Sequence, residues 1–339
     1  MMTAAETGTG AGTGAGVGGG AGTGAGVGAG NGAGGPADGL VPGGGAPLSG
    51  QAAVDELIGL LDLEQIEVDI FRGVSPKVSL QRVFGGQVAG QALVAAGRTV
   101  PAERRVHSLH AYFIRAGDPS VPIVYQVDRV RDGRSFTTRR VSAIQHGNVI
   151  FTLSASFKLP ESGLDHQLPP PPVPAPEELP TSAELARAAT VPLPAFSRVS
   201  RPVDLRWVDA PSWLDRSGEP RAPHSSVWLR ADGVLPDDPL LHVCVLTYAS
   251  DMTLLDSVVR PHGVGLGTGE LKVASLDHAM WFHRPFRADE WCLYVSDSPS
   301  ASDARGLATG RIWSRDGRHV ASVVQEGLIR VRRTAGAGR

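Results

Sequence analysis

The chain has 339 residues, of which 42% are hydrophobic and 19% are charged, and its formal net charge is -2 at pH 7. A chain of this length and composition suggests about two domains with hydrophobic cores. The near-neutral charge offers no electrostatic surface for nucleic acid, and no run of roughly 18 apolar residues predicts a membrane helix. We therefore expect neither nucleic acid nor a membrane as a partner.

The cysteines and the chain ends bear on the cellular compartment. Cys244 and Cys292 each lie in an apolar, strand-like run and form no C-x-x-C pair. We interpret them as buried, reduced thiols, which are typical of the cytosol. The first residues lack the basic start and bulky apolar stretch of a secretory signal, and the last three are not Ser-Lys-Leu. The sequence thus predicts a cytoplasmic protein.

Two breaks in composition divide the chain. Residues 1–47 are mainly Gly, Ala, Thr and Val, and they predict a disordered tail because they cannot bury enough apolar surface to offset the ordering entropy. Residues 160–200 contain a proline-rich run and predict a stiff, solvated linker with a short surface helix within 177–189. The breaks predict an N-terminal domain over 51–159 and a C-terminal domain over 201–332.

In the first domain, a helix rich in Gly and Ala is predicted over 85–99. Three strand-like runs follow over 121–130, 135–145 and 149–158. Asp-Gly and His-Gly pairs separate these runs, and such pairs suit tight hairpins because Gly accepts positive φ. Alternate residues over 151–157 are apolar, which predicts a strand with one buried face.

The second domain repeats this pattern. A helix is predicted over 251–259, followed by strands over 291–296, 305–314 and 319–331. Each interior Gly in the first helix costs roughly 1 kcal/mol relative to Ala, so this helix needs a partner that approaches it closely. A curved sheet wrapped around the helix would supply one. The predicted fold is α+β, a tandem (double) hot dog in which each unit is a central helix wrapped by a curved antiparallel sheet.

Three polar side chains in apolar surroundings are candidates for chemistry. Asp251, at the predicted start of the second helix, is either a helix cap or a carboxylate that accepts a proton from water. Ser275, on a strand predicted within 273–286, either bonds the backbone or offers a hydroxyl to a cleft. Gln325, inside an apolar strand, is either bonded to backbone or orients water and a developing oxyanion.

The histidines near these candidates do not predict a metal site. His278 and His283 lack the H-E-x-x-H spacing, and no third ligand lies nearby in the sequence. We interpret both as packed, hydrogen-bonded side chains. We expect neither a metal nor a cofactor.

An ordered set of motifs gives the chain its resemblance to the type II, TesB-like acyl-CoA thioesterase family. The motifs of the second domain are Tyr-Ala-Ser-Asp at 248–251, Leu-Asp-His-Ala-Met-Trp-Phe-His-Arg-Pro-Phe at 276–286, Ser-Ala-Ser-Asp-Ala-Arg-Gly at 300–306 and Val-Gln-Glu-Gly at 324–327. The motifs of the first domain are Phe-Gly-Gly-Gln-Val-Ala-Gly-Gln-Ala at 84–92, His-Ser-Leu-His-Ala-Tyr-Phe at 107–113 and Arg-Asp-Gly-Arg-Ser-Phe at 131–136. The resemblance covers nearly all of residues 51–332.

The resemblance implies a double hot dog with a catalytic trio of Asp, Thr or Ser, and Gln around one water. At the matching positions these residues are Asp251, Ser275 and Gln325. Ser275 keeps the hydroxyl of the Thr that is frequent in relatives and lacks its methyl group. The implied activity is hydrolysis of fatty acyl-CoA, the substrate partner, to free fatty acid and coenzyme A in lipid metabolism. We also expect identical chains to associate into a homo-oligomer.

Further residues are predicted to contact the substrate. The backbone N–H groups at Gly85 and Gly86 are expected to stabilise the oxyanion. His107 lies near the position that corresponds to Ser275 in the other domain, and it either lines the site or is a structural histidine. The first helix starts with Gly86-Gln87 where the second domain has Ser250-Asp251, so we predict one active site per chain. Four arginines are candidates for the phosphates of coenzyme A, with solvated surface as the alternative: Arg134, Arg139, Arg140 and Arg305.

Two other functions are open at this point. A hot-dog hydratase or dehydratase would be expected to pair Asp251 with a histidine at the helix start, and the next histidine in the sequence is His262, beyond the helix. A non-catalytic acyl-CoA-binding protein would keep the fold, although retention of all three polar positions argues against this. Release of free thiol from acyl-CoA separates hydrolysis from both.

Overall fold

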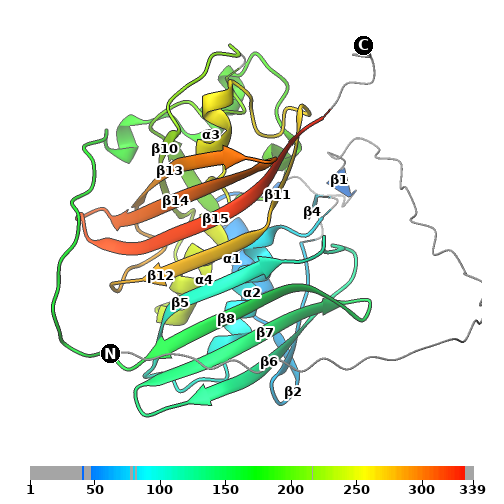
Figure 1. The fold of residues 1–339 in the computed structure, drawn as a ribbon, viewed down its shortest axis with the longest axis vertical. Coiled ribbons are helices and arrows are strands. Elements are labelled where there is room, and N and C mark those ends of the chain that lie inside the picture. The colour runs from blue at the N-terminus through cyan, green and yellow to red at the C-terminus, as the bar shows by residue number, and fades with distance from the viewer. Residues whose placement is uncertain (1–39, 42–46, 77–78, 81, 216, 333–339) are drawn as a thin grey trace, which may run out of the picture. The chain divides into compact units, whose positions relative to one another are not determined.

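One antiparallel sheet runs through both halves of the sequence in the computed structural model, which describes residues 40–41, 47–76, 79–80, 82–215 and 217–332 (Figure 1). The spatial order is β2-β3-β6-β7-β8-β5 in the first half, continued by β12-β15-β14-β13-β10-β9, with β11 beside β15. The strands are β2 (Glu64–Glu67), β3 (Ile70–Gly73), β5 (Arg105–Phe113), β6 (Ile123–Asp132), β7 (Phe136–Gln145), β8 (Asn148–Lys158), β9 (Val203–Trp207), β10 (His224–Ala231), β11 (Leu271–Ser275), β12 (Asp277–Phe282), β13 (Cys292–Ser302), β14 (Arg305–Ser314) and β15 (His319–Val331). Strands β5 and β12 pair antiparallel and join the two halves.

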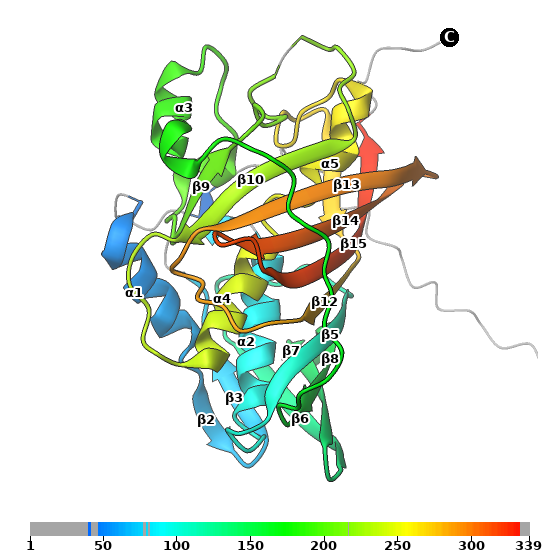
Figure 2. The same ribbon diagram turned by 90° about the vertical axis from the view of Figure 1, so that its left-hand side faces the viewer.

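Helices α2 and α4 run next to each other on one face of this sheet (Figure 2). The α-helices are α1 (Gly50–Leu61), α2 (Gly85–Gly97), α3 (Ser182–Ala188), α4 (Pro239–Ser250) and α5 (Asp256–Val259). Short 3-10 helices are η1 (Pro176–Glu178), η2 (Ala195–Arg198) and η3 (Arg260–His262).

The strands that follow each central helix lie close to where the sequence predicts them, except that β13 continues to Ser302 instead of ending at 296. Strands β6, β7 and β8 form consecutive antiparallel pairs, as do β13, β14 and β15. On β8, Phe151, Leu153, Ala155 and Phe157 are each 1% exposed, which confirms the predicted buried face. Helix α2 is confirmed to within two residues at its end, and its residues 86–96 are all buried.

The glycines of α2 bring a second helix close. A Cβ at Gly86 would lie 2.3 Å from the backbone oxygen of Tyr248, and one at Gly90 would lie 3.3 Å from that of Cys244. Gly90 follows Gly86 in α2, whereas its neighbour Cys244 precedes Tyr248 in α4, so the two helices run antiparallel. The sequence predicted close approach of the sheet, and the structure corrects this for these two glycines, which face the backbone of α4.

We predict that Gly86→Ala destabilises the protein, because the added methyl group overlaps the Tyr248 carbonyl and forces α2 away from α4. The expected loss in the free energy of unfolding is about 1–3 kcal/mol, measured by urea denaturation. Gly59→Ala on α1 is the matched control, since a Cβ there meets no atom within 4 Å. It should be neutral or stabilising by up to about 1 kcal/mol. Equal effects of the two substitutions would contradict the packing argument.

The central helix of the second half begins at Pro239 instead of Asp251, so the helix predicted over 251–259 is wrong. The side chain of Asp238 caps the helix by accepting a hydrogen bond in the first turn, and proline suits the position that follows. The helix ends at Ser250, and Asp251 is the next residue. Only the short α5 lies within the predicted range.

The interpretation of Cys244 as part of a strand is also wrong, because it lies inside α4. This helix is apolar around most of its circumference and contains β-branched Val243, Val245 and Thr247, which favour strands. Its sequence therefore lacks the 3.6-residue alternation that identifies a half-buried helix. The strand interpretation of Cys292, at the start of β13, is confirmed.

The proline-rich segment is bonded to the second-half sheet instead of being solvated throughout. Trp228 Nε1 donates to the carbonyl of Pro174 at 2.9 Å, and Trp313 Nε1 donates to that of Leu168 at 3.1 Å. The predicted surface helix within this segment is confirmed as α3.

The predicted tail, residues 1–47, lies outside the described residues apart from 40–41 and 47. Leu40–Val41 forms β1, which pairs antiparallel with β4 (Ser79–Leu80).

Candidate active site

Asp251, Ser275 and Gln325, called the trio below, meet at the end of α4. Ser275 Oγ donates to Asp251 Oδ1 at 3.1 Å. Gln325 Nε2 donates to the same carboxylate oxygen at 2.9 Å and to Ser275 Oγ at 2.5 Å. Gln325 is 0% exposed, whereas the acid and the alcohol are half-buried. The structure thus brings the three predicted residues together, with the acid and the alcohol on the accessible side.

A bulge between β11 and β12 determines which side chains face the trio's amide. Ser275 pairs with Gly327 of β15, and Ala279 pairs with Val324. The segment from Ser275 to Ala279 therefore advances four residues while its partner segment on β15 advances three. An extra residue of this kind reverses the side-chain alternation beyond it. Ser275 and His278 therefore face the same amide, although an unbroken strand predicts them on opposite faces.

His278 is the site residue whose partner the sequence did not reveal. Its Nδ1 lies 2.8 Å from Gln325 Oε1, and its Nε2 lies 2.9 Å from Ser250 Oγ. The prediction of a packed, hydrogen-bonded side chain is confirmed for His278, which is 1% exposed, whereas His283 is exposed and only its hydrogen bond, to Ser322 Oγ at 2.9 Å, agrees with the prediction. Burial lowers the pKa of His278 from its ordinary value, which favours a neutral ring. Neither the bulge nor the 47-residue separation from Gln325 leaves a local sequence pattern.

The Asp251 carboxylate lies at the N-terminal end of α2, and not at the start of a helix of its own. The backbone N–H of Gly86 is one of its hydrogen-bond partners. Unpaired N–H groups in a first helical turn carry partial positive charge and stabilise an anion. Burial nevertheless raises the pKa of Asp251 above its ordinary value, while His278, Gln325, Ser275 and the Gly86 amide oppose this rise. The carboxylate is therefore a stronger base than an ordinary aspartate.

Gly85 and Gly86, the predicted oxyanion donors, lie beside the Asp251 carboxylate. A Cβ at Gly85 would lie 2.6 Å from Asp251 Oδ2 and 2.8 Å from the ring of Phe113, so the position has no room for a side chain. The N–H of Gln87 donates to the carbonyl of Phe84, the residue before the helix, at 3.1 Å. The N–H of Gly86 donates to the Asp251 carboxylate. These two amides already have acceptors, which leaves Gly85 as the predicted oxyanion donor.

His107 does not lie with the trio. Strand β5 pairs with β12 so that Tyr112 faces Asp277, which places His107 toward the other end of β5. Its Nε2 lies 2.8 Å from Ser156 Oγ, and its ring meets that of Phe136 edge-on at 5.7 Å. The expectation that His107 lines the site beside Ser275 is corrected, because the strands run antiparallel across the junction.

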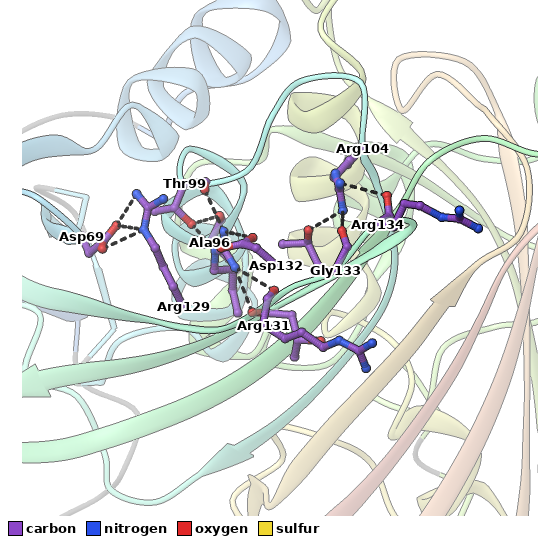
Figure 3. Close-up of polar contacts among 12 residues, drawn as sticks. Asp69, Ala96, Thr99, Arg104, Arg129, Arg131, Asp132, Gly133 and Arg134 are labelled. Carbon is purple, nitrogen blue, oxygen red and sulfur yellow. Dashed lines mark hydrogen bonds and ion pairs between the residues drawn. The ribbon is translucent and has the colours of Figure 1, made fainter.

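Arg139 has a structural environment. Its guanidinium is 1% exposed and donates to both oxygens of Thr99 and to Asp132 Oδ1. Thr99 and Asp132 lie close together just past the C-terminal end of α2 (Figure 3). The donors of Arg139 are therefore engaged within the protein and do not face a ligand. The other arginine candidates stay exposed: Arg134, Arg140 and Arg305.

Neither a metal cluster nor a reactive thiol is found in the described part of the chain. Within it, no group of three or more His, Cys, Asp and Glu side chains is arranged to hold a metal ion. The helices of the described ranges also include none long and apolar enough to cross a membrane. Cys244 and Cys292 are free and buried. Burial raises the pKa of both thiols, that of Cys292 to about 12, so neither supplies a thiolate nucleophile at neutral pH.

Two central helices on one face of a continuous antiparallel sheet define a tandem hot-dog protein, as predicted. Comparison with known proteins gives matches to both halves. Residues 199–328 match the family described as acyl-CoA thioesterase, and residues 74–158 match the acyl-CoA thioesterase N-terminal domain. The chain belongs to the acyl-CoA thioesterase family.

Individual relatives match over most of their length. Acyl-coenzyme A thioesterase 8 of Mus musculus is 41% identical over 301 residues, covering 84% of this chain and 92% of the relative. Acyl-CoA thioesterase 2 of Haemophilus influenzae is 40% identical, covering 82% and 98%. The crystal structure of the acyl-CoA thioesterase II TesB2 from Mycobacterium marinum is 46% identical, with a TM-score of 0.68, covering 82% of this chain and 98% of that one.

Proposed function

We propose that this chain hydrolyses fatty acyl-CoA by the attack of a water molecule that binds to the trio. The observation that carries the mechanism is the mutual hydrogen bonding of Asp251, Ser275 and Gln325 on a half-accessible carboxylate. Membership of the acyl-CoA thioesterase family supports the substrate class.

The reaction proceeds by general base catalysis. Asp251 accepts a proton from the water while Ser275 Oγ and Gln325 Nε2 orient its oxygen toward the thioester carbonyl carbon. The new C–O bond gives a tetrahedral oxyanion, which the N-terminal end of α2 at Gly85 stabilises. Collapse of this intermediate breaks the C–S bond, and the thiolate of coenzyme A takes up the proton. A positioned base contributes about 10²–10⁴-fold, and one oxyanion donor about 10²–10³-fold.

The thiolate is a good leaving group, so this sequence of steps requires no metal and no covalent nucleophile. The trio belongs to the second half of the chain, and the first half contributes the amides of α2. This composite arrangement supports one active site per chain. The sequence supported one site by comparing Gly86-Gln87 with Ser250-Asp251 as the starts of two helices. That comparison does not hold, because Asp251 follows α4 instead of beginning a helix.

We expect kcat/KM to decrease at acidic pH. Because burial raises the pKa of Asp251, the decrease should begin at a pH above the ordinary Asp pKa of about 3.9. The base works only when it is deprotonated, so activity is present above this pKa and falls about tenfold per pH unit below it. The titratable groups facing Asp251 are His278 and Tyr294. A pH profile of kcat/KM that stays flat down to pH ~4 would contradict the assignment.

The rival hydratase activity would need a histidine beside Asp251, and the structure places His278 there although no histidine is close in the sequence. Both ring nitrogens of His278 are engaged, by Ser250 and Gln325, and the ring is buried, so it cannot contact a substrate. Purified protein should release free thiol from saturated acyl-CoA, detected with a thiol reagent, and should not hydrate enoyl-CoA. Tight binding of acyl-CoA without thiol release would favour the non-catalytic alternative.

We also propose how the chain is divided into domains and where in the cell the protein is located. We propose that 51–159 and 201–332 are the two structural units, with 160–200 as their linker and 1–47 outside the reaction. The buried free thiols support a cytoplasmic location. A homo-oligomer is proposed from the family resemblance. Cell fractionation and sedimentation of the purified chain test these two points.

A further inference from the structure

The Gln325 amide is useful to the trio in only one of its two orientations. Its Nε2 faces Asp251 Oδ1 and Ser275 Oγ, and its Oε1 faces His278 Nδ1. An amide has donors on nitrogen and acceptors on oxygen, so a rotation by 180° would place a carbonyl oxygen against the carboxylate. Some group must therefore favour the working orientation.

We propose that His278 is a positioning residue that holds the Gln325 amide with its NH₂ group toward Asp251 and Ser275. This inference rests on the proposed function, in which Gln325 orients the attacking water. His278 is 1% exposed and does not touch the substrate, so it acts through Gln325.

The donors and acceptors around His278 determine which of its ring nitrogens carries a hydrogen. A carbonyl oxygen cannot donate, so the 2.8 Å contact with Gln325 requires a hydrogen on His278 Nδ1. In a neutral ring Nε2 is then an acceptor. The Ser250 hydroxyl lies 2.9 Å from this nitrogen and 2.9 Å from the Thr247 carbonyl, and rotation of its one hydrogen toward the ring lets it donate to Nε2. Ser250 is 0% exposed and immediately precedes Asp251 at the end of α4. A series of hydrogen bonds thus runs from Ser250, the residue before Asp251, through His278 and Gln325 to the Asp251 carboxylate.

The environment of His278 favours the neutral Nδ1–H form. Burial lowers the pKa of the ring, while Asp251, Asp277 and the Gln325 hydrogen bond oppose this effect. Tyr294 is the other titratable group at this point, and its hydroxyl donates to the Ser250 carbonyl at 3.2 Å. A ring with one proton on Nδ1 can satisfy both of its neighbours, whereas the Nε2–H form would leave two acceptors facing each other at Gln325.

Two substitutions separate positioning from packing. The amide nitrogen introduced by His278→Asn occupies roughly the place of the ring Nδ1, so this variant keeps a donor for Gln325, whereas the longer amide of His278→Gln reaches toward Ser250. We expect kcat to fall about tenfold or less in His278→Asn and about 10²-fold in His278→Gln, with KM nearly unchanged in both. Equal losses, or a smaller loss in His278→Gln, would overturn the proposal.

The matched control is His242→Leu. His242 is also a buried histidine, 3% exposed on α4, and its Nδ1 accepts the N–H of Ala288 at 3.0 Å. This variant should lower the melting temperature and leave kcat within about twofold, which shows that loss of a buried histidine does not by itself slow the reaction. Loss of kcat in parallel with melting temperature across all three variants would overturn positioning.

A measurement on the unaltered protein does not depend on folding of the variants or on activity. Nitrogen-15 NMR of the histidine rings distinguishes Nδ1–H from Nε2–H. We expect His278 to be neutral and protonated on Nδ1 at pH 7, and an Nε2–H form would overturn the inference. This result is separable from the proposed function, which fails instead if Asp251→Asn hydrolyses acyl-CoA normally.

Discussion

Asp251→Asn should reduce kcat for thiol release from acyl-CoA by about 10²–10⁴-fold, because the amide cannot accept a proton from water at neutral pH. Asn keeps an oxygen for the hydrogen bonds from Ser275 and Gln325, so binding and fold should persist. KM should change little. The measurement is steady-state hydrolysis followed with a thiol reagent, and a kcat within a few-fold of the unaltered enzyme would reject Asp251 as the base.

Stability gives this variant an internal check. The folded protein binds the Asp251 proton more tightly than the unfolded chain does, since burial raises this pKa. The carboxyl thus lowers stability as pH rises from about 4 through its folded pKa, and this effect is present in full above it. Asp251→Asn removes the effect and should not melt below the unaltered protein at neutral pH.

Asp256→Asn is the matched control for Asp251→Asn. Asp256 is 1% exposed, accepts the N–H of Ser212 at 2.9 Å and pairs with Arg260 at 3.3 Å. Replacing it should cost stability, because buried Arg260 loses its partner, and should leave the chemistry unchanged. Opposite effects of the two substitutions on rate and melting temperature are therefore expected.

Gln325→Glu should reduce kcat/KM by about 10²–10³-fold at neutral pH. The new side chain has almost the same shape and still offers an oxygen to His278, but it replaces the donor that lies 2.9 Å from Asp251 Oδ1 with a second acidic oxygen. Two carboxyl groups this close share a proton, so the pKa of Asp251 rises further. The acidic limb of the pH profile should move to higher pH.

Gln145→Glu is the control for Gln325→Glu. Gln145 is 5% exposed, and its Nε2 donates to the carbonyls of Asp118 and Val121, in the first half of the chain. Its replacement should lower stability and leave the acidic limb where it is in the unaltered enzyme. If both variants shift the limb equally, the shift does not report the pKa of Asp251.

The sequence was sufficient for the parts of the fold that are encoded locally. Helix α2 and the hairpins of both halves follow from small residues, alternation and Gly-containing turns. Helix α4 was not predictable from periodicity, because it is buried around most of its circumference and so lacks a polar stripe. The Asp238–Pro239 pair was its only local start pattern, which the prediction of a helix over 251–259 overlooked.

The site shows a similar division. The trio was found through the resemblance of ordered motifs, and the structure brings its members into contact. The placement of Asp251 at the start of α2 depends on antiparallel packing of two helices, and the role of His278 depends on a one-residue bulge. Neither has a sequence pattern, because both arise from contacts between segments far apart in the chain.

The central claim is that Asp251 and Ser275 act on one water molecule, and a double-variant cycle tests it most directly. Residues that act as a unit give losses that do not multiply. The kcat values for thiol release should be compared among Asp251→Asn, Ser275→Ala and the variant that combines them. We predict that the combined variant is hardly slower than Asp251→Asn alone. A combined loss equal to the product of the two separate losses would contradict a shared water.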